Sequence, residues 1–241
     1  MQDAPVRPRP RRDRRGPLAS LAWRHLEAWS KNQSRRGMPA FFDRCYAGIP
    51  AGGRALSVGA GGPIPGRLQA AARARGFSVI TLDFSPERRP GVVADACRSP
   101  FARDAFDAVV MGEVLEHCHD PVGALAGAHA CLKPGGLLVL TTPFLFPIHN
   151  APVDYWRFTR HGLELLLRGW ADVDVRERNG WPEATNVLRS RVYKAQGSNL
   201  LVGLALGVAA RLLAAPSRWL GRLVTTDAAT TGYVCTARKP A

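Results

Sequence analysis

The sequence predicts an α/β fold in which a doubly wound, mostly parallel sheet carries helices on both faces. Short apolar stretches that suit buried strands alternate with longer stretches that suit helices. The first apolar stretch, 55–58, leads directly into glycines, and the second ends at Asp83. Ligands bind such sheets beyond the carboxyl ends of the strands, so we expect the glycines and Asp83 to lie together there.

The predicted elements follow one another in a regular order. Residues 18–47 have helical spacing that is interrupted near Gly37, which predicts two helices ahead of the sheet. Strands are predicted at 54–58, 78–82, 92–94, 106–111 and 137–141, with helices at 66–75 and 121–132 and a turn at 133–136. A helix at 160–168, a half-exposed strand at 170–178 and a last strand at 231–238 complete the pattern.

Length and cysteine content limit the domain organisation. A chain of 241 residues can hold one substantial domain. We expect that domain to span 18–241, after a disordered basic tail at 1–17 and with a helical insertion at 183–224. The five cysteines form no CxxC pair, so the sequence predicts a reducing, cytoplasmic setting and neither a disulfide framework nor a zinc cluster.

The chain is strongly basic, with a formal net charge of +14. Arginines between Arg7 and Arg15 supply part of this charge, and the rest is spread along the chain. A basic surface can attract nucleic acid, anionic lipid or a phosphorylated substrate, but arginine also serves simply as a solvated surface cation. Charge alone therefore selects none of these partners.

The order of the motifs is more specific than any one of them. The glycine turn at 59–62 is followed by the segments 81–83, 94–96, 106–110 and 133–136. In this order the chain resembles the class I S-adenosylmethionine (SAM)-dependent methyltransferases, of the methyltransferase type 11-like, ubiquinone/menaquinone-type superfamily. The resemblance covers roughly 50–180 and the last strand. It implies a seven-stranded Rossmann-like sheet with an antiparallel final pair, and SAM as cofactor. Helices ahead of the sheet often cover the site in this family; alternatively, their aromatic side chains simply pack on the sheet.

The resemblance also implies which residues hold the cofactor. Glycines let a ligand approach the backbone closely, and an acid at a strand end can accept hydrogen bonds from ribose hydroxyls. The expected cofactor-binding residues are Ser57, Gly59 and Gly61 near the methionine part, Asp83 at the ribose, Phe84, Asp95 and Ala96 at the adenine, and Gly112 and Glu113 at the sulfonium.

Two residues depart from the family pattern. Ser57 stands where the glycine motif usually begins with an acid, and Pro63 stands where its last glycine is expected. Ser57 removes a negative charge near the ammonium group of the ligand, and Pro63 removes a backbone N–H and fixes φ at about −65°. Both changes are expected to weaken SAM binding. A nicotinamide cofactor is disfavoured, because Ile64 stands where its motif needs glycine.

A first candidate group for the chemistry is the segment 113–117. Spacings of three and four place Glu113, Glu116 and His117 on one face of an expected helix. A matching acid–acid–histidine set is assigned to a metal in the ubiquinone-pathway O-methyltransferases, but similar segments occur widely without one, so we predict no metal ligand. His117 is a candidate acid, base or substrate contact, or else a hydrogen-bonded residue at a helix end.

A second candidate group is the loop at 143–159, which follows the fifth strand. Loops on a rigid scaffold often hold substrate groups. We expect His149 to be the catalytic base. Asp154 and Arg157 either contact the substrate or pair with each other to brace the loop, and Thr159 is expected to cap the next helix.

An uninterrupted apolar run at 200–210 lies between the last two predicted strands. Arg211, Arg218, Trp219 and Arg222 follow it. The run is shorter than the ~20 apolar residues that span a bilayer. Apolar surface beside arginine and tryptophan suits a helix that lies in a membrane interface. The segment 200–222 is therefore predicted either to contact the inner face of the membrane or to pack against protein.

The leading functional prediction is a SAM-dependent methyltransferase that acts on a small or lipid-linked acceptor, at oxygen. RNA methylation is an alternative suggested by the charge, but the sequence has no interleaved basic and aromatic stretch, so a nucleic-acid partner is not expected. A catalytically silent SAM-fold scaffold is a further alternative, suggested by Ser57 and Pro63. The sequence does not define an oligomeric state.

Overall fold

The computed structural model describes residues 17–191 and 200–241. By their contacts these residues form a sheet unit (37–144, 155–176 and 233–241) and a helical unit (17–36, 145–154, 177–191 and 200–232). The tail predicted at 1–17 lies outside the described residues except for Pro17, and so does 192–199 of the predicted insertion. The division into a tail and one domain stays a prediction.

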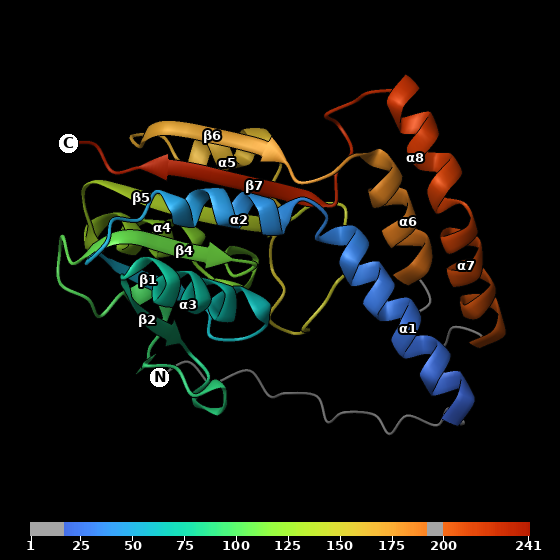
Figure 1. Cartoon of the computed structure of the whole chain (residues 1–241), viewed down its shortest axis with the longest axis horizontal. Helices are drawn as coiled ribbons and strands as arrows, with labels where there is room; N and C mark the ends of the chain where they lie inside the picture. The colour runs from blue at the N-terminus through green and yellow to red at the C-terminus, as the bar shows by residue number, and fades with distance from the viewer. Residues whose placement is uncertain (1–16, 192–199) are drawn as a thin grey trace. The chain divides into compact units, whose positions relative to one another are not determined.

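A seven-stranded sheet forms the sheet unit, with the strand order β3-β2-β1-β4-β5-β7-β6 (Figure 1). Its strands are β1 Arg54–Val58, β2 Ser78–Asp83, β3 Val92–Val93, β4 Phe106–Gly112, β5 Leu132–Pro143, β6 Ala171–Glu177 and β7 Gly232–Arg238. The strands from β1 to β5 pair in parallel. β7 runs the opposite way beside β5, because Gly135 N–H donates to Lys239 O and Lys239 N–H donates to Gly136 O. The predicted fold class is confirmed, and the order of connection reverses between β1 and β4, where such sheets bind ligands.

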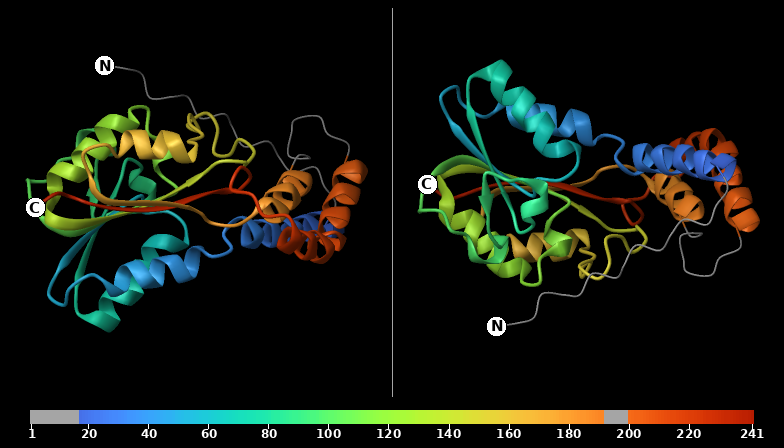
Figure 2. Two further views of the ribbon diagram at one scale, coloured as in Figure 1. Left: turned by 90° about the horizontal axis from the view of Figure 1, so that it is seen from above. Right: turned by 90° about the horizontal axis from the view of Figure 1, so that it is seen from below.

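Helices cover both faces of this sheet (Figure 2). α2 Met38–Ala47 and α3 Pro63–Arg75 pack on one face, and α4 Pro121–Cys131 and α5 Arg160–Leu166 pack on the other. Three short 3-10 helices follow the carboxyl ends of strands: η1 Pro86–Arg88, η2 Ala96–Arg98 and η3 Leu115–His117. After β2, β3 and β4 the carboxyl edge of the sheet is therefore built from short turns.

Successive side chains of a strand point to opposite faces of the sheet, so each face has its own hydrophobic core. On β4, Val109 and Met111 join the core with α4, whereas Val110 joins the core with α2 and α3. In that second core Phe42 and Tyr46 of α2 stack with ring centroids 5.5 Å apart. The aromatic side chains of α2 therefore pack on the sheet, which was one of the two expectations for this region.

Two predicted boundaries are wrong, for identifiable reasons. Residues 133–136 do not precede β5 as a turn, because Phe106 pairs with Leu132 and Ala108 with Leu137, which makes 133–136 a bulge opposite Asp107. α3 begins at Pro63 rather than at 66, since the fixed φ of proline suits the first position of a helix.

The helical unit contains α1 Pro17–Ser34, α6 Trp181–Arg191, α7 Leu200–Leu212 and α8 Ala214–Leu223 (Figure 1). Here α6 contacts α1, α7 and α8. Small residues permit this packing: a Cβ on Gly207 would lie 2.7 Å from Leu26 Cδ1, and a Cβ on Gly221 would lie 2.6 Å from Pro182 Cγ. The grouping of α1 with the helices between β6 and β7 was not predicted from the sequence.

Candidate cofactor site

The glycine turn after β1 is held by the carboxylate at the end of β2. Asp83 Oδ2 accepts the N–H of Ala60 at 2.8 Å, and Asp83 Oδ1 accepts the N–H of Ser85 at 2.9 Å. The side chain is buried, with 3% of the residue exposed. A carboxylate offers about four acceptor positions, so Asp83 can fix the turn and still accept hydrogen bonds from a ligand at this edge.

The residues of the turn have conformations that explain their identity. Gly59 has a left-handed φ of 86°, and a Cβ on it would lie 2.7 Å from Val114 Cγ2. Ser57 is buried in β1 with its Oγ 3.4 Å from Gly59 O. Pro63 is the first residue of α3, where a backbone N–H has no acceptor within the helix. The local fold thus accommodates both departures from the family pattern, and their effect on SAM binding stays a prediction.

Arg88 is a residue of this site that sequence reasoning missed. Its Nη1 lies 3.3 Å from Asp83 Oδ2, and a Cβ on Gly61 would lie 2.7 Å from the same Nη1. The side chain of Arg88 is 46% exposed, so it can swing away from the turn at little cost in burial. The sequence gives no signal for it, because only the turn through Ser85 and η1 brings the guanidinium back over the glycines.

Phe84, Asp95 and Ala96 lie at the ends of neighbouring strands. Ala94 N–H donates to Asp83 O at 3.1 Å, which joins the segment after β3 to the end of β2. Phe84 is 54% exposed, and Asp95 caps η2 through a 2.9 Å bond from Cys97 N–H to its Oδ1. An exposed ring beside an exposed acid can stack on a purine and accept from its amino group. Together with the glycine turn, these groups fit the adenosine part of SAM.

The segment after β4 does not form the predicted helical face. Glu113 has a left-handed φ of 57°, and its N–H donates to Thr141 O at 2.9 Å. This conformation separates Glu113 from η3, which covers only Leu115–His117. Glu116 is fully buried, with its Oε1 3.6 Å from His117 Nε2. The prediction that joins Glu113, Glu116 and His117 on one face is therefore wrong.

Gly112, the last residue of β4, serves packing inside the sheet unit. A Cβ on Gly112 would lie 2.5 Å from Ile64 Cδ1, so glycine lets the first turn of α3 approach the end of β4. This places the N-terminus of α3, Gly112 and Glu113 around the switch point between β1 and β4. Of these, Gly112 and Glu113 are the residues expected near the sulfonium.

The loop after β5 contributes a histidine–aspartate pair to the helical unit. His149 Nδ1 lies 3.2 Å from Asp154 Oδ2, and the same oxygen accepts the backbone N–H of His149 at 2.7 Å. Asp154 is almost fully buried, whereas 23% of the His149 side chain is exposed. Phe146 meets the imidazole edge to face at 5.3 Å. The carboxylate therefore orients the imidazole ring with Nδ1 toward Asp154.

Farther along the same segment, two expectations concern helix capping and bracing. Thr159 Oγ1 accepts the N–H of Gly162 at 3.0 Å, which confirms the predicted cap of α5. Arg157 Nη1 donates to the carbonyl of Trp156 at 2.7 Å. Tyr155 N–H and Trp156 Nε1–H bond to Glu116 O and Cys118 O at 2.9 Å each, which fastens this segment to the turn after β4.

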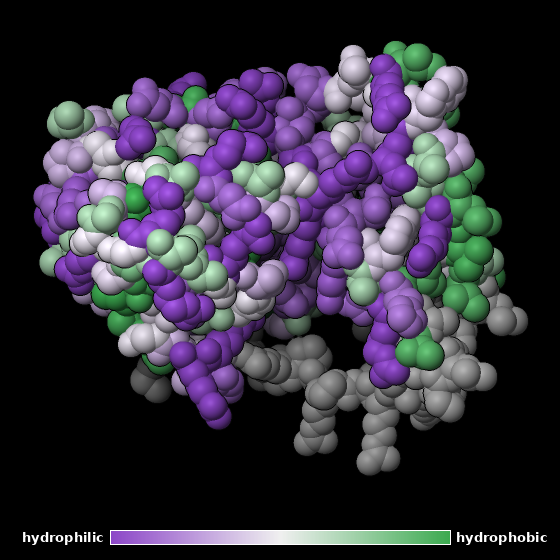
Figure 3. Space-filling view, viewed as in Figure 1, coloured by the Kyte–Doolittle hydropathy of each residue, from purple (hydrophilic) through white to green (hydrophobic). Residues whose placement is uncertain are grey.

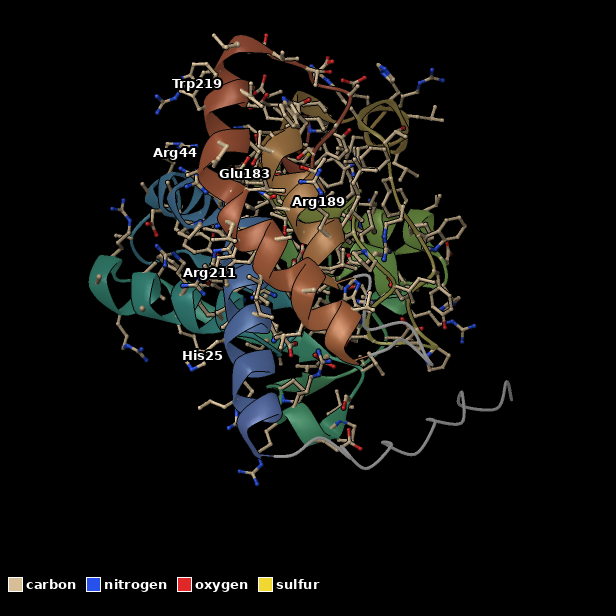
Figure 4. All side chains as sticks on the ribbon, turned by 90° about the vertical axis from the view of Figure 1, so that its right-hand side faces the viewer. His25, Arg44, Glu183, Arg189, Arg211 and Trp219 are labelled. Carbon is tan, nitrogen blue, oxygen red and sulfur yellow. The ribbon has the colours of Figure 1, made fainter. Side chains whose placement is uncertain are left out.

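The apolar run of the helical unit turns its large side chains outward. Gly207, Ala210, Ala214 and Ser217 face the other helices. We call the exposed large apolar residues the outer apolar face; they are Val202, Leu206, Val208, Leu212, Leu213, Trp219, Leu220, Leu223 and Val224. Figure 3 shows this hydrophobic surface over α7, and Trp219 points away from α6 in Figure 4.

Among residues 17–191 and 200–241, no helix has both the length and the apolar character needed to cross a membrane.

Comparison with known proteins adds to this geometry. The methyltransferase domain family matches residues 28–176. A demethylmenaquinone methyltransferase of Renibacterium salmoninarum is 36% identical over 139 residues, which are 52% of this chain and 56% of that protein. A ubiquinone biosynthesis O-methyltransferase of Xanthomonas axonopodis pv. citri is 36% identical over 108 residues, which are 39% and 44% of the two chains. The chain thus spans about half the length of the curated relatives it matches.

A solved structure supports the fold. Phosphoethanolamine N-methyltransferase 2 of Haemonchus contortus, in complex with SAM, has a TM-score of 0.56 and 20% identity, over 82% of this chain and 51% of that one. At this identity the likeness shows the architecture of the sheet and its helices.

Proposed function

We propose that this chain, which belongs to the methyltransferase domain family and is a SAM-dependent methyltransferase, transfers a methyl group to an oxygen of a small or lipid-linked acceptor. The observation that carries the cofactor part is the buried Asp83, which holds the glycine turn through Ala60. The acceptor part is supported by the His149–Asp154 pair and by the outer apolar face.

In this proposal the sheet unit holds the cofactor. Asp83 accepts hydrogen bonds from the ribose hydroxyls once Arg88 has moved off its Oδ2. Phe84 lies against the adenine, and Asp95 and the backbone of Ala96 form hydrogen bonds with it. SAM supplies a methyl group on a positively charged sulfur, so the protein has mainly to align the two reactants, which can contribute ~7–11 kcal/mol.

The same proposal gives the remaining cofactor residues distinct positions. Gly59 and Gly61 let the methionine part lie on the backbone, with Ser57 behind them in β1. Gly112 and Glu113 lie at the sulfonium end. His117 is proposed as a substrate contact, since 16% of its side chain is exposed beside the buried Glu116.

A hydroxyl acceptor must lose its proton as the new bond forms, and His149 is the proposed base. Its Nε2 would take that proton, while the methyl group supplied by SAM would pass to the acceptor oxygen and leave S-adenosylhomocysteine. Asp154 stabilises the imidazolium and keeps the ring oriented. A positioned base of this kind contributes about 10²–10⁴-fold to the rate.

The acceptor class is proposed from the relatives and from the surface. Both relatives described above have names that contain a quinone, and one of them is named an O-methyltransferase. An aromatic hydroxyl on a lipid-linked ring is therefore the acceptor we favour. The outer apolar face suits an enzyme that works at a membrane. No Asp or Glu occurs in 200–226, whereas Arg211, Arg218 and Arg222 do, so we propose peripheral contact with an anionic membrane surface.

The experiment that tests the function follows a labelled methyl group. Purified protein is incubated with methyl-tritiated SAM and either a bacterial lipid extract or the water-soluble small molecules of the same cells. We expect label in an organic-phase product, lost in His149→Ala and kept in His161→Ala, because His161 is 89% exposed on α5. Label only in water-soluble products would exclude the lipid acceptor. Failure of the folded protein to bind SAM would replace the enzyme by a scaffold.

A further inference from the structure

The side chain of Arg88 lies in the space that the missing side chain of Gly61 leaves open. A Cβ on Gly61 would lie 2.7 Å from Nη1, 3.0 Å from Cζ and 3.2 Å from Nε of Arg88. Gly61 does not have the left-handed φ of Gly59 and Gly62, so its backbone conformation does not itself require glycine. The guanidinium therefore lies on the bare backbone of the turn, where a ligand can approach most closely.

The same guanidinium also covers the carboxylate that is proposed to bind the ribose. Arg88 Nη1 is 3.3 Å from Asp83 Oδ2, an oxygen that already accepts Ala60 N–H at 2.8 Å. Only 2% of the Asp83 side chain is exposed, and a buried carboxylate is costly without an opposite charge or hydrogen bonds. Arg88 supplies that charge from the solvent side, since 46% of its side chain is exposed. A guanidinium on Gly61 and Asp83 and a ribose on the same two residues exclude each other.

Arg88 is anchored by its backbone, but its side chain is loosely held. Its N–H donates to Ser85 O at 3.2 Å, and Arg89, with a φ of 50°, ends η1 directly after it. The 3.3 Å contact with Asp83 is longer than the ~2.7–2.9 Å of a strong charge-assisted hydrogen bond. Among the residues that the structure describes, the guanidinium has no second hydrogen bond or ion pair. Rotation of this side chain alone can therefore uncover the turn and the carboxylate.

We infer that Arg88 is an internal competitor of the cofactor and lowers the affinity for every ligand that carries the ribose. The inference rests on the proposed function, because it takes Asp83 as the ribose-binding residue. Since the ribose binds only after Arg88 has moved away, the observed Kd is the intrinsic Kd divided by the fraction of molecules in which Asp83 is uncovered. An exposed ion pair favours its closed arrangement by a factor of about 1.4–5, which raises the observed Kd about 2–6-fold.

Isothermal calorimetry of the full-length protein with SAM, S-adenosylhomocysteine and adenosine tests this competition without any methyl transfer. Arg88→Ala should lower the Kd of all three ligands by the same factor, about 2–6-fold. The three ligands share the ribose, but SAM carries a positively charged sulfur and adenosine is uncharged. Relief of charge repulsion alone would therefore strengthen SAM and leave adenosine unchanged.

Arg73→Ala is the matched control, because it removes the same charge from an exposed position in the last turn of α3. It should change none of the three Kd values, and circular dichroism confirms that both variants are folded.

The possible outcomes separate this inference from the cofactor site itself. Folded Arg88→Ala protein with wild-type Kd values, or with weaker binding, would overturn the inference and leave the cofactor site in place. A gain confined to SAM would also overturn it, since repulsion rather than displacement would then be the cause. If neither the wild type nor Arg88→Ala binds any of the three ligands, the proposed function fails together with the inference. Binding by Arg88→Ala but not by the wild type would support the inference.

Discussion

Replacing Asp83 by asparagine separates the two tasks assigned to this carboxylate. The wild-type side chain accepts Ala60 N–H at 2.8 Å and Ser85 N–H at 2.9 Å. Asparagine keeps one acceptor oxygen and turns the other position into a donor, so one of these buried N–H groups loses its partner. A hydrogen bond to a charged acceptor contributes about 1.5–3 kcal/mol, and we expect the free energy of unfolding to fall by about that amount.

Cofactor binding should fall further. The ribose diol loses an anionic acceptor, which removes one or two hydrogen bonds of the charged kind, or about 2–4 kcal/mol in total. Since 1.4 kcal/mol is a factor of ten, the Kd for SAM should rise about 30–1000-fold. Asp43→Asn is the matched control, because Asp43 forms an exposed ion pair with Arg67 on the outside of the same unit, at 2.7 Å. That variant should change the Kd by less than about twofold.

Isothermal calorimetry with both SAM and S-adenosylhomocysteine gives the decisive comparison. The two ligands share the ribose and differ in the charge of the sulfur. If Asp83 acts on the ribose, the variant weakens both ligands by the same factor. A larger loss for SAM alone would mean that Asp83 acts on the positive charge, and a folded Asp83→Asn protein that binds both ligands as the wild type does would refute the reasoning.

Three further predictions concern packing, pH and the outer apolar face. Gly221→Ala should lower the free energy of unfolding by about 1–3 kcal/mol in urea titration, because the new Cβ would meet the rigid Pro182 ring at 2.6 Å. Gly66→Ala in α3 is the control: a Cβ there has nothing within 4 Å, so the free energy of unfolding should rise by about 0.5–1 kcal/mol. Burial raises the pKa of Asp107, but the bonds from Lys133 Nζ and Arg54 N–H lower it more, so the pKa lies below its ordinary value. The stability that Asp107 contributes is therefore present above its unfolded-state pKa of about 3.9 and is lost as the pH falls through the folded-state value. Asp107→Asn should cost about 1–2 kcal/mol at about pH 7 and much less near pH 3; an equal cost at both would contradict the assignment. Trp219→Glu with Leu223→Glu should weaken co-sedimentation with phosphatidylglycerol vesicles at least about 10-fold, whereas Leu165→Glu, 54% exposed on α5, should not; unchanged sedimentation would argue for a protein partner.

The strands were predictable because each carries its own signal. Continuous apolar runs at β1, β4 and β5 are typical of strands buried on both faces, and the glycines and Asp83 mark the ends of their strands. The sequence could not predict backbone conformations that depend on contacts with neighbouring elements. Glu113 is one example, since a left-handed acid has no propensity signal, and its φ of 57° breaks the helical spacing on which the prediction rested.

A second limit was that the sequence could not predict which side chains from distant segments come together. Asp95 and His119 are 24 residues apart in the sequence, yet η2 packs against α4 and the two side chains come together, with His119 Nδ1 3.9 Å from Asp95 Oδ2. The outer apolar face was predictable only as a choice between membrane and protein packing. In the structure the small residues of this segment pack against α1 and α6, while the large apolar side chains face outward. What the outward face contacts stays a prediction.

Ser57 and Pro63 depart from the family motif, and the structure suggests why the turn survives them. The position of Ala60 is fixed by the carboxylate of Asp83 on the next strand, not by an acid on β1. Pro63 lies at the first position of α3, where the lost N–H had no helical acceptor. Asp83 thus takes over the anchoring of the turn in addition to its expected role at the ribose. A chain built this way should depend more heavily on Asp83 than on residue 57, so Ser57→Ala should cost far less in SAM affinity than Asp83→Asn.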